Sequence, residues 1–132
     1  MKIDSHLRKI ERFQKTISKL DLKEDSETLI EDFMLTSAHY VNAAMHKMGH
    51  VKEDNDIKHN KLFGFIKKEK AFGNISEEVA NLIGIIEQLR PSYVYGKGED
   101  TEAAKRAKMA FERIRKICTE VLKDEIESKN SN

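Results

Sequence analysis

The chain has 132 residues, of which 39% are hydrophobic and 36% are charged, with 24 Lys and Arg against 23 Asp and Glu. This length suits one ordinary domain, and the hydrophobic content excludes a disordered chain, whereas the nearly neutral charge leaves the class of partner open. No apolar run approaches the roughly 20 residues that span a bilayer, and the first residues lack the apolar stretch of a secretory signal. We therefore expect a cytoplasmic protein without a membrane segment. Cys118 is the single cysteine, so it has no partner for an internal disulfide.

Apolar residues recur at intervals of three, four or seven through most of the chain, which is the pattern of amphipathic helices. A first helix is predicted over residues 3–20, followed by a turn over 21–25. The second and longest helix should begin at Asp25 or Ser26, both good N-caps, and stop at Gly49.

The next two helices are predicted from similar signals. Apolar residues over 57–72 indicate a third helix that ends at Gly73. Ser76 should cap the fourth helix. Pro91 should end that helix near Arg90, because the residue before a proline disfavours the α conformation.

A fifth helix, capped by Thr101, should run to Leu122. The connections are short, so neighbouring helices should pack antiparallel. The predicted fold is all-α: an antiparallel bundle of four to five helices, formed by a single domain over residues 1–126, with a frayed tail over 127–132.

Charge is segregated along the chain. Residues 21–32 contain six acidic side chains and one lysine, whereas residues 57–72 contain five lysines and one glutamate. The lysines of this second stretch are Lys58, Lys61, Lys67, Lys68 and Lys70. Such a face, with Lys97 as a further member, could bind phosphates. The preferred alternative is a solvated face whose lysines interact favourably with a helix C-terminus.

Three histidines lie on nearly the same side of the second predicted helix. His46 and His50 have the i, i+4 spacing of zinc-binding helices, but His39 lies about 10 Å further along the axis. No HExxH motif or carboxylate partner accompanies them in the segment. We therefore expect no metal, and interpret the histidines as packing against a neighbouring helix or hydrogen-bonding across an interface. His59 stands beside an apolar stripe, as a capping or core histidine would.

The segment LRPSYVYGKG, residues 89–98, combines charge, aromatic rings and glycines. Arg90 follows Ile83 and Ile86 on the inward edge of its helix, where a guanidinium needs an anion or a carbonyl as partner. Tyr93 and Tyr95 add hydroxyls and ring faces, and two glycines allow a ligand to approach the backbone. The candidate nucleotide- or RNA-binding residues are Arg90, Tyr93, Tyr95 and Lys97. In the alternative interpretation Arg90 caps carbonyls or reaches to water, and the tyrosines close the core.

The order of the segments AHYVNAAMH, IKHNKLFGFIKK and LRPSYVYG, with an Ala-rich last helix, resembles HEPN domains. It is similar in particular to the small stand-alone HEPN proteins found beside minimal nucleotidyltransferases. The resemblance covers roughly residues 26–122. It implies a bundle of four or five helices, usually a homodimer, in which an Arg-x4-6-His motif faces the dimer cleft and, in active members, cuts RNA without a metal.

Four residues fall at positions of that family's motifs. Arg90 matches the motif arginine. Tyr95 stands where the motif histidine would fall, and Pro91 replaces a polar residue that often follows the arginine. A tyrosine hydroxyl, with a pKa near 10, is a poorer general base than histidine. His59 matches a histidine that often opens the third helix, and could approach Arg90 in space. Arg90, Tyr95 and His59 are therefore the candidate catalytic residues.

These observations lead to two main functional hypotheses. The first is a dimeric HEPN-type module that binds nucleotide or RNA phosphate and acts with a nucleotidyltransferase-fold partner in a toxin–antitoxin-like pair. The second is a divergent, metal-independent ribonuclease. A purely structural helical adaptor is a further alternative. None of these hypotheses requires a cofactor or a membrane.

Overall fold

The computed structural model describes residues 1–94 and 100–130, and of residues 91–94 it describes the backbone only. In this part of the chain six α-helices form: α1 (Ile3–Ile17), α2 (Ser26–Lys47), α3 (Leu62–Glu69), α4 (Ser76–Val94), α5 (Thr101–Val121) and α6 (Lys123–Asn130). Two short 3-10 helices, η1 (His59–Lys61) and η2 (Gly73–Ile75), flank α3. The described residues contain no strand, so the predicted all-α class is confirmed. None of their helices is both long enough and apolar enough to cross a membrane.

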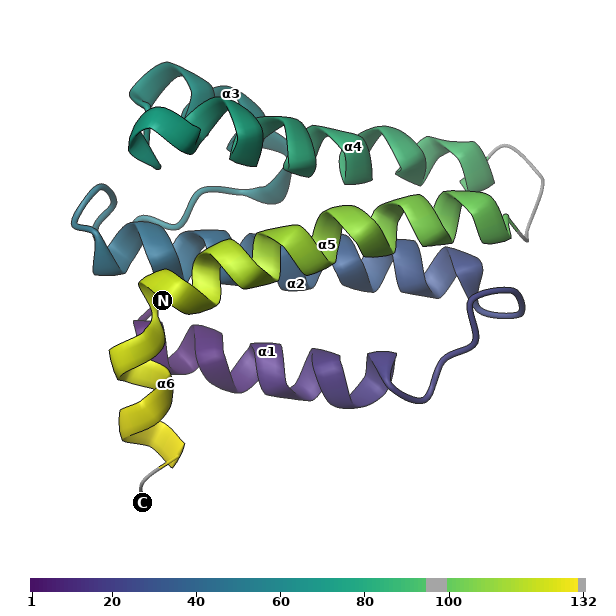
Figure 1. Cartoon of the computed structure of the whole chain (residues 1–132), viewed down its shortest axis with the longest axis horizontal. Helices are drawn as coiled ribbons and strands as arrows, with labels where there is room; N and C mark the ends of the chain where they lie inside the picture. Colours follow the sequence, from purple (N-terminus) through teal and green to yellow (C-terminus); the bar gives the residue numbers. More distant parts are fainter. Residues whose placement is uncertain (95–99, 131–132) are drawn as a thin grey trace.

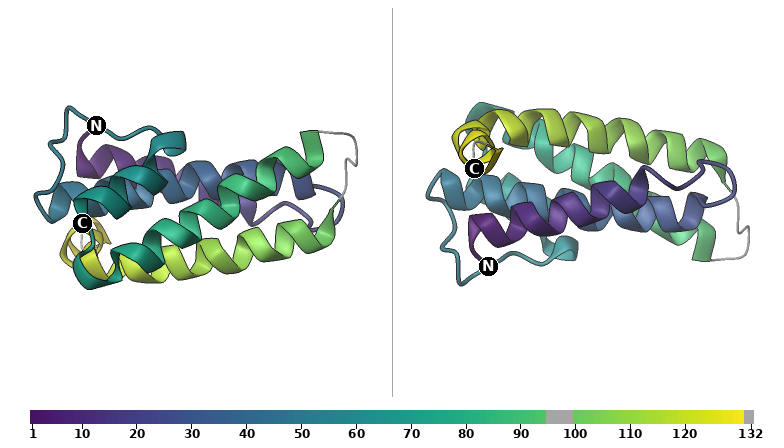
Figure 2. Two further views of the ribbon diagram at one scale, coloured as in Figure 1. Left: turned by 90° about the horizontal axis from the view of Figure 1, so that it is seen from above. Right: turned by 90° about the horizontal axis from the view of Figure 1, so that it is seen from below.

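The helices α2 and α5 form the centre of the molecule (Figure 1). Helix α1 packs on α2, helix α4 packs on both α2 and α5, and α3 packs on α4. Consecutive long helices run antiparallel in α1–α2 and α4–α5, whereas α2 and α5 run in the same direction (Figure 1). The short α6 crosses the end of the bundle at which the chain begins (Figures 1 and 2).

The core is densest where α2 meets its neighbours. Ile30, Met34 and Met45 of α2 are completely buried. The ring of Phe33 stacks on Phe111 of α5, with 5.0 Å between ring centroids. Because α1, α4 and α5 all contact α2, this helix buries apolar residues on more than one face, and it is the element against which functional side chains are positioned.

The connection between α2 and η1 has no regular structure, but buried polar groups of α2 hold it. Asn42 accepts a hydrogen bond from the Ile57 amide (2.8 Å) and donates one to the Ile57 carbonyl (2.9 Å). The ring nitrogen Nδ1 of His46 lies 2.9 Å from the Val51 carbonyl oxygen. These bonds fix the backbone on either side of Asp56 and shortly before His59.

The helix ends differ from the sequence-based expectations in the first half of the chain. Helix α1 ends at Ile17 and not at residue 20. The helix expected over 57–72 is reduced to α3, because Lys70 adopts a left-handed conformation (φ 48°) that ends it. The hydroxyl of Ser26 caps nothing within α2; it accepts a hydrogen bond from the Asp100 amide at 2.9 Å.

The second half shows three further differences. Helix α4 does not end near Arg90 but continues to Val94, since a proline so close to a helix C-terminus disrupts only the last turn. Asp100, and not Thr101, caps α5, its carboxylate accepting from the Ala103 amide at 3.0 Å. Residues 123–130 form α6 where fraying was expected from residue 127. Ion pairs from Glu125 to Lys47 and from Lys129 to Glu11 hold this helix on the bundle.

Candidate functional site

Arg90 forms the centre of a polar cluster between α2 and α4. Its Nε and Nη2 each donate a hydrogen bond of 2.9 Å to one carboxylate oxygen of Glu31, so this pair is bidentate. Glu31 lies on α2, on the face that meets α4. The planar fork of a guanidinium matches a carboxylate in this way, which fixes the orientation of the arginine as well as its position.

Glu87 and His59 complete the group, which we call the Arg90 cluster (Glu31, His59, Glu87 and Arg90). Nη1 of Arg90 donates to both carboxylate oxygens of Glu87, at 2.9 and 3.0 Å. Nδ1 of His59, at the start of η1, lies 3.0 Å from Oε1 of Glu87 and 3.2 Å from Nη1 of Arg90. The sequence-based expectation that His59 could approach Arg90 therefore agrees with the structure.

The two contacts of His59 Nδ1 require opposite protonation of that nitrogen. The Glu87 carboxylate can only accept, so that contact needs a proton on Nδ1, whereas Arg90 can only donate and needs the lone pair. A neutral His59 can change between the two tautomers without moving its ring. The position of the ring hydrogen therefore decides whether His59 bonds to Glu87 or to Arg90.

The cluster is partly open to solvent. The side chains of Arg90 and Glu87 are 25% and 23% exposed, and that of His59 is 33% exposed. Partial desolvation lowers the pKa of Arg90, but the hydrogen bonds to Glu31 and Glu87 outweigh it and raise that pKa above its ordinary value. Arg90 is thus a permanent cation whose side chain stays partly exposed.

Exposed lysines precede and follow His59 in the sequence. Lys58 and Lys61 flank His59 in the chain, and three more lysines follow on α3 and at its end. All five lysines of this stretch are exposed: Lys58, Lys61, Lys67, Lys68 and Lys70. None of them forms an ion pair with any residue that the structure describes, although Lys67 lies over the ring of Phe63, 5.3 Å from its centroid.

The candidate residues from the sequence divide into two groups. The structure brings Arg90 and His59 together. The side chain of Tyr93, and Tyr95 and Lys97 entirely, lie outside the described residues. Sequence reasoning missed both carboxylates of the cluster. Glu87 carries a local signal, since it precedes Arg90 by one helical turn, whereas Glu31 is 59 residues away and carries none.

A second polar group, which we call the histidine cluster, joins α1, α2 and the 48–58 connection. It consists of His6, His39, His46 and Asp56. Nε2 of His6 lies 3.1 Å and Nε2 of His46 lies 2.7 Å from the same oxygen of Asp56, Oδ1. Nδ1 of His6 lies 2.9 Å from Nδ1 of His39. His39 and His46 therefore contact a neighbouring helix, as expected, whereas His50 lies beyond the end of α2 and is exposed.

Burial shifts the pKa values of this cluster. Burial lowers the pKa of His6, and burial together with nearby positive charge lowers the pKa of His39 to about 4. Desolvation raises the pKa of Asp56, but hydrogen bonds from His46 and His6 outweigh it and leave that pKa below its ordinary value. His39 is accordingly neutral near pH 7, and Asp56 is ionised.

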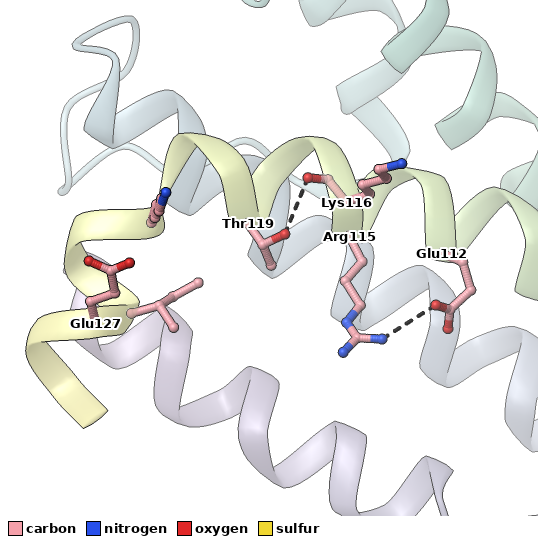
Figure 3. Close-up of a pocket in the computed structure, with 7 residues that line it drawn as sticks. Glu112, Arg115, Lys116, Thr119 and Glu127 are labelled. Atoms are coloured by element: carbon pink, nitrogen blue, oxygen red, sulfur yellow. Dashed lines mark hydrogen bonds and ion pairs between the residues drawn. The ribbon is translucent and has the colours of Figure 1, made fainter. Parts of the chain in front are cut away.

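A surface hollow of about 650 Å³ lies elsewhere, between α5 and α6 (Figure 3). Its charged lining is partly paired, since Arg115 donates to Glu112 at 3.3 Å. The lining residues are Glu112, Arg115, Lys116, Thr119, Lys123, Ile126 and Glu127. They include no residue of the Arg90 cluster or the histidine cluster, so this hollow takes no part in either site.

Comparison with models of known protein families, with curated proteins and with solved structures gives no match to this chain. The HEPN resemblance therefore rests on the short segments quoted above. The geometry of the two polar clusters is the basis from which a function can be inferred.

Proposed function

We propose that the chain is a HEPN-type helical module that binds RNA or nucleotide phosphate at the Arg90 cluster. One observation carries the proposal: a guanidinium, oriented by Glu31 and Glu87, contacts His59 at a partly exposed surface. An arginine whose orientation is fixed in advance loses little side-chain entropy when a phosphate binds, and this favours recognition of a planar or tetrahedral anion.

The charges around Arg90 determine how strongly a phosphate is attracted to it. Glu31 and Glu87 orient the guanidinium, but they also repel an anion placed beside it. Nη2 donates one of its two hydrogens to Glu31, and the second can point to a phosphate oxygen. The exposed Lys58 and Lys61 supply the attraction over longer range that the cluster lacks, because its two carboxylates outnumber its one guanidinium. RNA, with phosphates spaced along a chain, engages both the arginine and the lysines.

The assembly belongs to the same proposal and rests on the HEPN resemblance. We propose a cytoplasmic homodimer whose paired Arg90 clusters line one cleft, and a nucleotidyltransferase-fold partner that regulates it in a toxin–antitoxin-like pair. Sedimentation equilibrium of the purified chain tests the dimer. A strict monomer at high concentration would remove the paired cleft, while leaving phosphate binding by the single chain open to its own test.

Fluorescence anisotropy with labelled single-stranded RNA, and with labelled ATP, tests the binding. Arg90→Ala should weaken the affinity about 10- to 100-fold, equivalent to the roughly 1.5–3 kcal/mol of a charge-assisted hydrogen bond. Arg113→Ala is a matched control, because Arg113 also pairs with a glutamate, Glu78 at 3.0 Å, but on an exposed surface of α5. Equal affinities of the two variants would contradict the proposal.

The contact between His59 and Arg90 favours a second candidate, metal-independent cleavage of RNA. A histidine that exchanges a proton beside a fixed cation has the parts needed to activate a ribose hydroxyl and to stabilise the charge on the phosphate. Glu87→Gln separates the two candidates. Removing this negative charge should strengthen RNA binding, whereas it should slow cleavage, because the amide no longer orients the protonated His59. Chelator should leave cleavage unchanged.

A further inference from the structure

The histidine cluster brings three potential metal ligands to one point from three separate segments. Nε2 of His6 in α1, Nε2 of His46 in α2 and a carboxylate oxygen of Asp56 in the 48–58 connection all lie within 4.8 Å of one another. The side chains of His6 and His46 are 2% and 0% exposed, while that of Asp56 is 33% exposed. The group is therefore open to solvent on the carboxylate side only.

The hydrogen bond of His46 to the backbone determines which of its nitrogens carries a proton. A carbonyl oxygen can only accept, so Nδ1, at 2.9 Å from the Val51 oxygen, bears the hydrogen. In the neutral ring the lone pair of Nε2 then faces Asp56 Oδ1 at 2.7 Å. Two acceptors at this distance repel each other unless a proton lies between them, and a metal bound by both would hold the two atoms further apart, at about 3.3 Å.

The same arrangement recurs at His6, whose Nδ1 lies 2.9 Å from Nδ1 of His39. A neutral His39 can accept the Nδ1 hydrogen of His6 at this distance. The lone pair of His6 Nε2 then also faces Oδ1 of Asp56, at 3.1 Å. Metal-binding histidines commonly donate the hydrogen of the other ring nitrogen to a carbonyl or a similar acceptor, which fixes the tautomer and the ring orientation.

We propose that His6, His46 and Asp56 bind a divalent first-row transition metal such as zinc. Two imidazoles and one carboxylate suit this class of cation, and Mg²⁺ or Ca²⁺ would require more oxygen ligands. Three protein ligands leave at least one coordination position for water on the exposed side of Asp56. This site is separate from the Arg90 cluster and does not depend on the proposed function. The sequence alone predicts that no metal is bound. That prediction considers His39, His46 and His50 as ligands, and not His6 or Asp56.

The competing explanation is a proton in place of the metal, with a positively charged His46 paired to Asp56. A proton satisfies the 2.7 Å contact as it stands, whereas a metal requires Nε2 of His46 and Oδ1 of Asp56 to move apart, so the experiment must measure the metal itself. Protein freed of metal by a chelator is titrated with Zn²⁺ in a calorimeter, and with Co²⁺ while the visible absorption of the bound ion is recorded. We expect one equivalent of each metal to bind per chain.

Asp56→Asn is the decisive variant, because the side chain is partly exposed and the amide can still accept hydrogen bonds, so the helical circular dichroism should be retained. Its affinity for Zn²⁺ should fall at least about tenfold, and the visible bands of Co²⁺ should be lost or displaced. His50→Ala is the matched control, since His50 is an exposed histidine outside the cluster, and it should bind as the wild type does. Absence of Zn²⁺ binding to the wild type, or equal binding by Asp56→Asn, would overturn the proposal.

Discussion

Asn42 is a single residue on which the position of both clusters depends. Its side chain is 3% exposed and hydrogen-bonds to the Ile57 amide and carbonyl, and also to the Ala38 carbonyl at 3.0 Å. Asp56 precedes Ile57 directly, and His59 follows two residues later. The hydrogen bonds of the Asn42 side chain therefore hold the backbone from which Asp56 extends toward α1 and His59 toward α4.

We predict that Asn42→Ala lowers the free energy of unfolding by about 2 kcal/mol, because it leaves backbone groups of Ile57 without their partner. Urea unfolding followed by circular dichroism measures this change. Asn60→Ala, at an exposed position of η1, is the control and should change stability by less than about 0.5 kcal/mol. Similar losses of unfolding free energy in the two variants would show that the hydrogen bonds from Asn42 to the Ile57 backbone contribute nothing specific to stability.

Cys118 provides a probe of the core at the residue scale. The side chain is 0% exposed, and burial raises the pKa of its thiol well above the ordinary value. Since the thiolate is the reactive species, we predict that native protein is modified by a thiol reagent only through unfolding. The labelling rate should rise with urea in parallel with the loss of helical signal. Rapid labelling without denaturant would contradict the burial of α5 against α2.

At the scale of single elements, α3 and the 3-10 helix η2 that follows it each contain one glycine, and the two have opposite roles. Gly64 lies within α3, and a Cβ added there would meet no atom within 4 Å. Gly73 has φ +61°, in the left-handed region that other residues avoid. Gly64→Ala should therefore stabilise the protein by about 0.5–1 kcal/mol through helix propensity. Gly73→Ala should destabilise it by about 1–2 kcal/mol.

Urea unfolding of the two alanine variants, compared with the wild type, measures both effects. The variants are a matched pair, because each adds one methyl group at an exposed position in the same part of the chain. Changes of the same sign in both would mean that backbone conformation does not explain either glycine.

The existence of the main helices could be predicted from the sequence, but several of their ends could not. Apolar periodicity reports which face packs inward, and this signal extends over many residues. An end depends on one or two residues and on the neighbouring chain. Asp100 caps α5 while its own amide is held by Ser26, which is 74 residues away. Helix α6 is similarly held by ion pairs with Glu11 of α1 and Lys47 of α2. Its own sequence contains few apolar residues and therefore predicts fraying.

At the scale of the whole molecule, both clusters are products of the fold. The sequence predicts Arg90 as a site residue from its place on an apolar helix face, and His59 from the family resemblance. Both predictions depend only on the residues close to each one in the chain. Glu31 and Arg90 lie 59 residues apart, and His6 and Asp56 lie 50 residues apart. One sequence without its relatives carries no information on such pairs, since only the packing of α1, α2 and α4 brings them together. Histidines without a partner nearby in the sequence therefore indicate only packing, whereas the structure brings His6 and His46 to the same carboxylate oxygen of Asp56.

The salt dependence of RNA binding tests the central claim, that Arg90 contacts a phosphate, most directly. Affinity for a short single-stranded RNA is measured by anisotropy at several salt concentrations, for the wild type and for Arg90→Ala. Each phosphate contact contributes about 0.7 to the slope of log affinity against log salt, because a counterion is released when it forms. The slope should become shallower by about this amount in Arg90→Ala, while circular dichroism shows unchanged folding. Two coincident lines, or a lower melting temperature with an unchanged slope, would show that Arg90 only tethers α4 to α2.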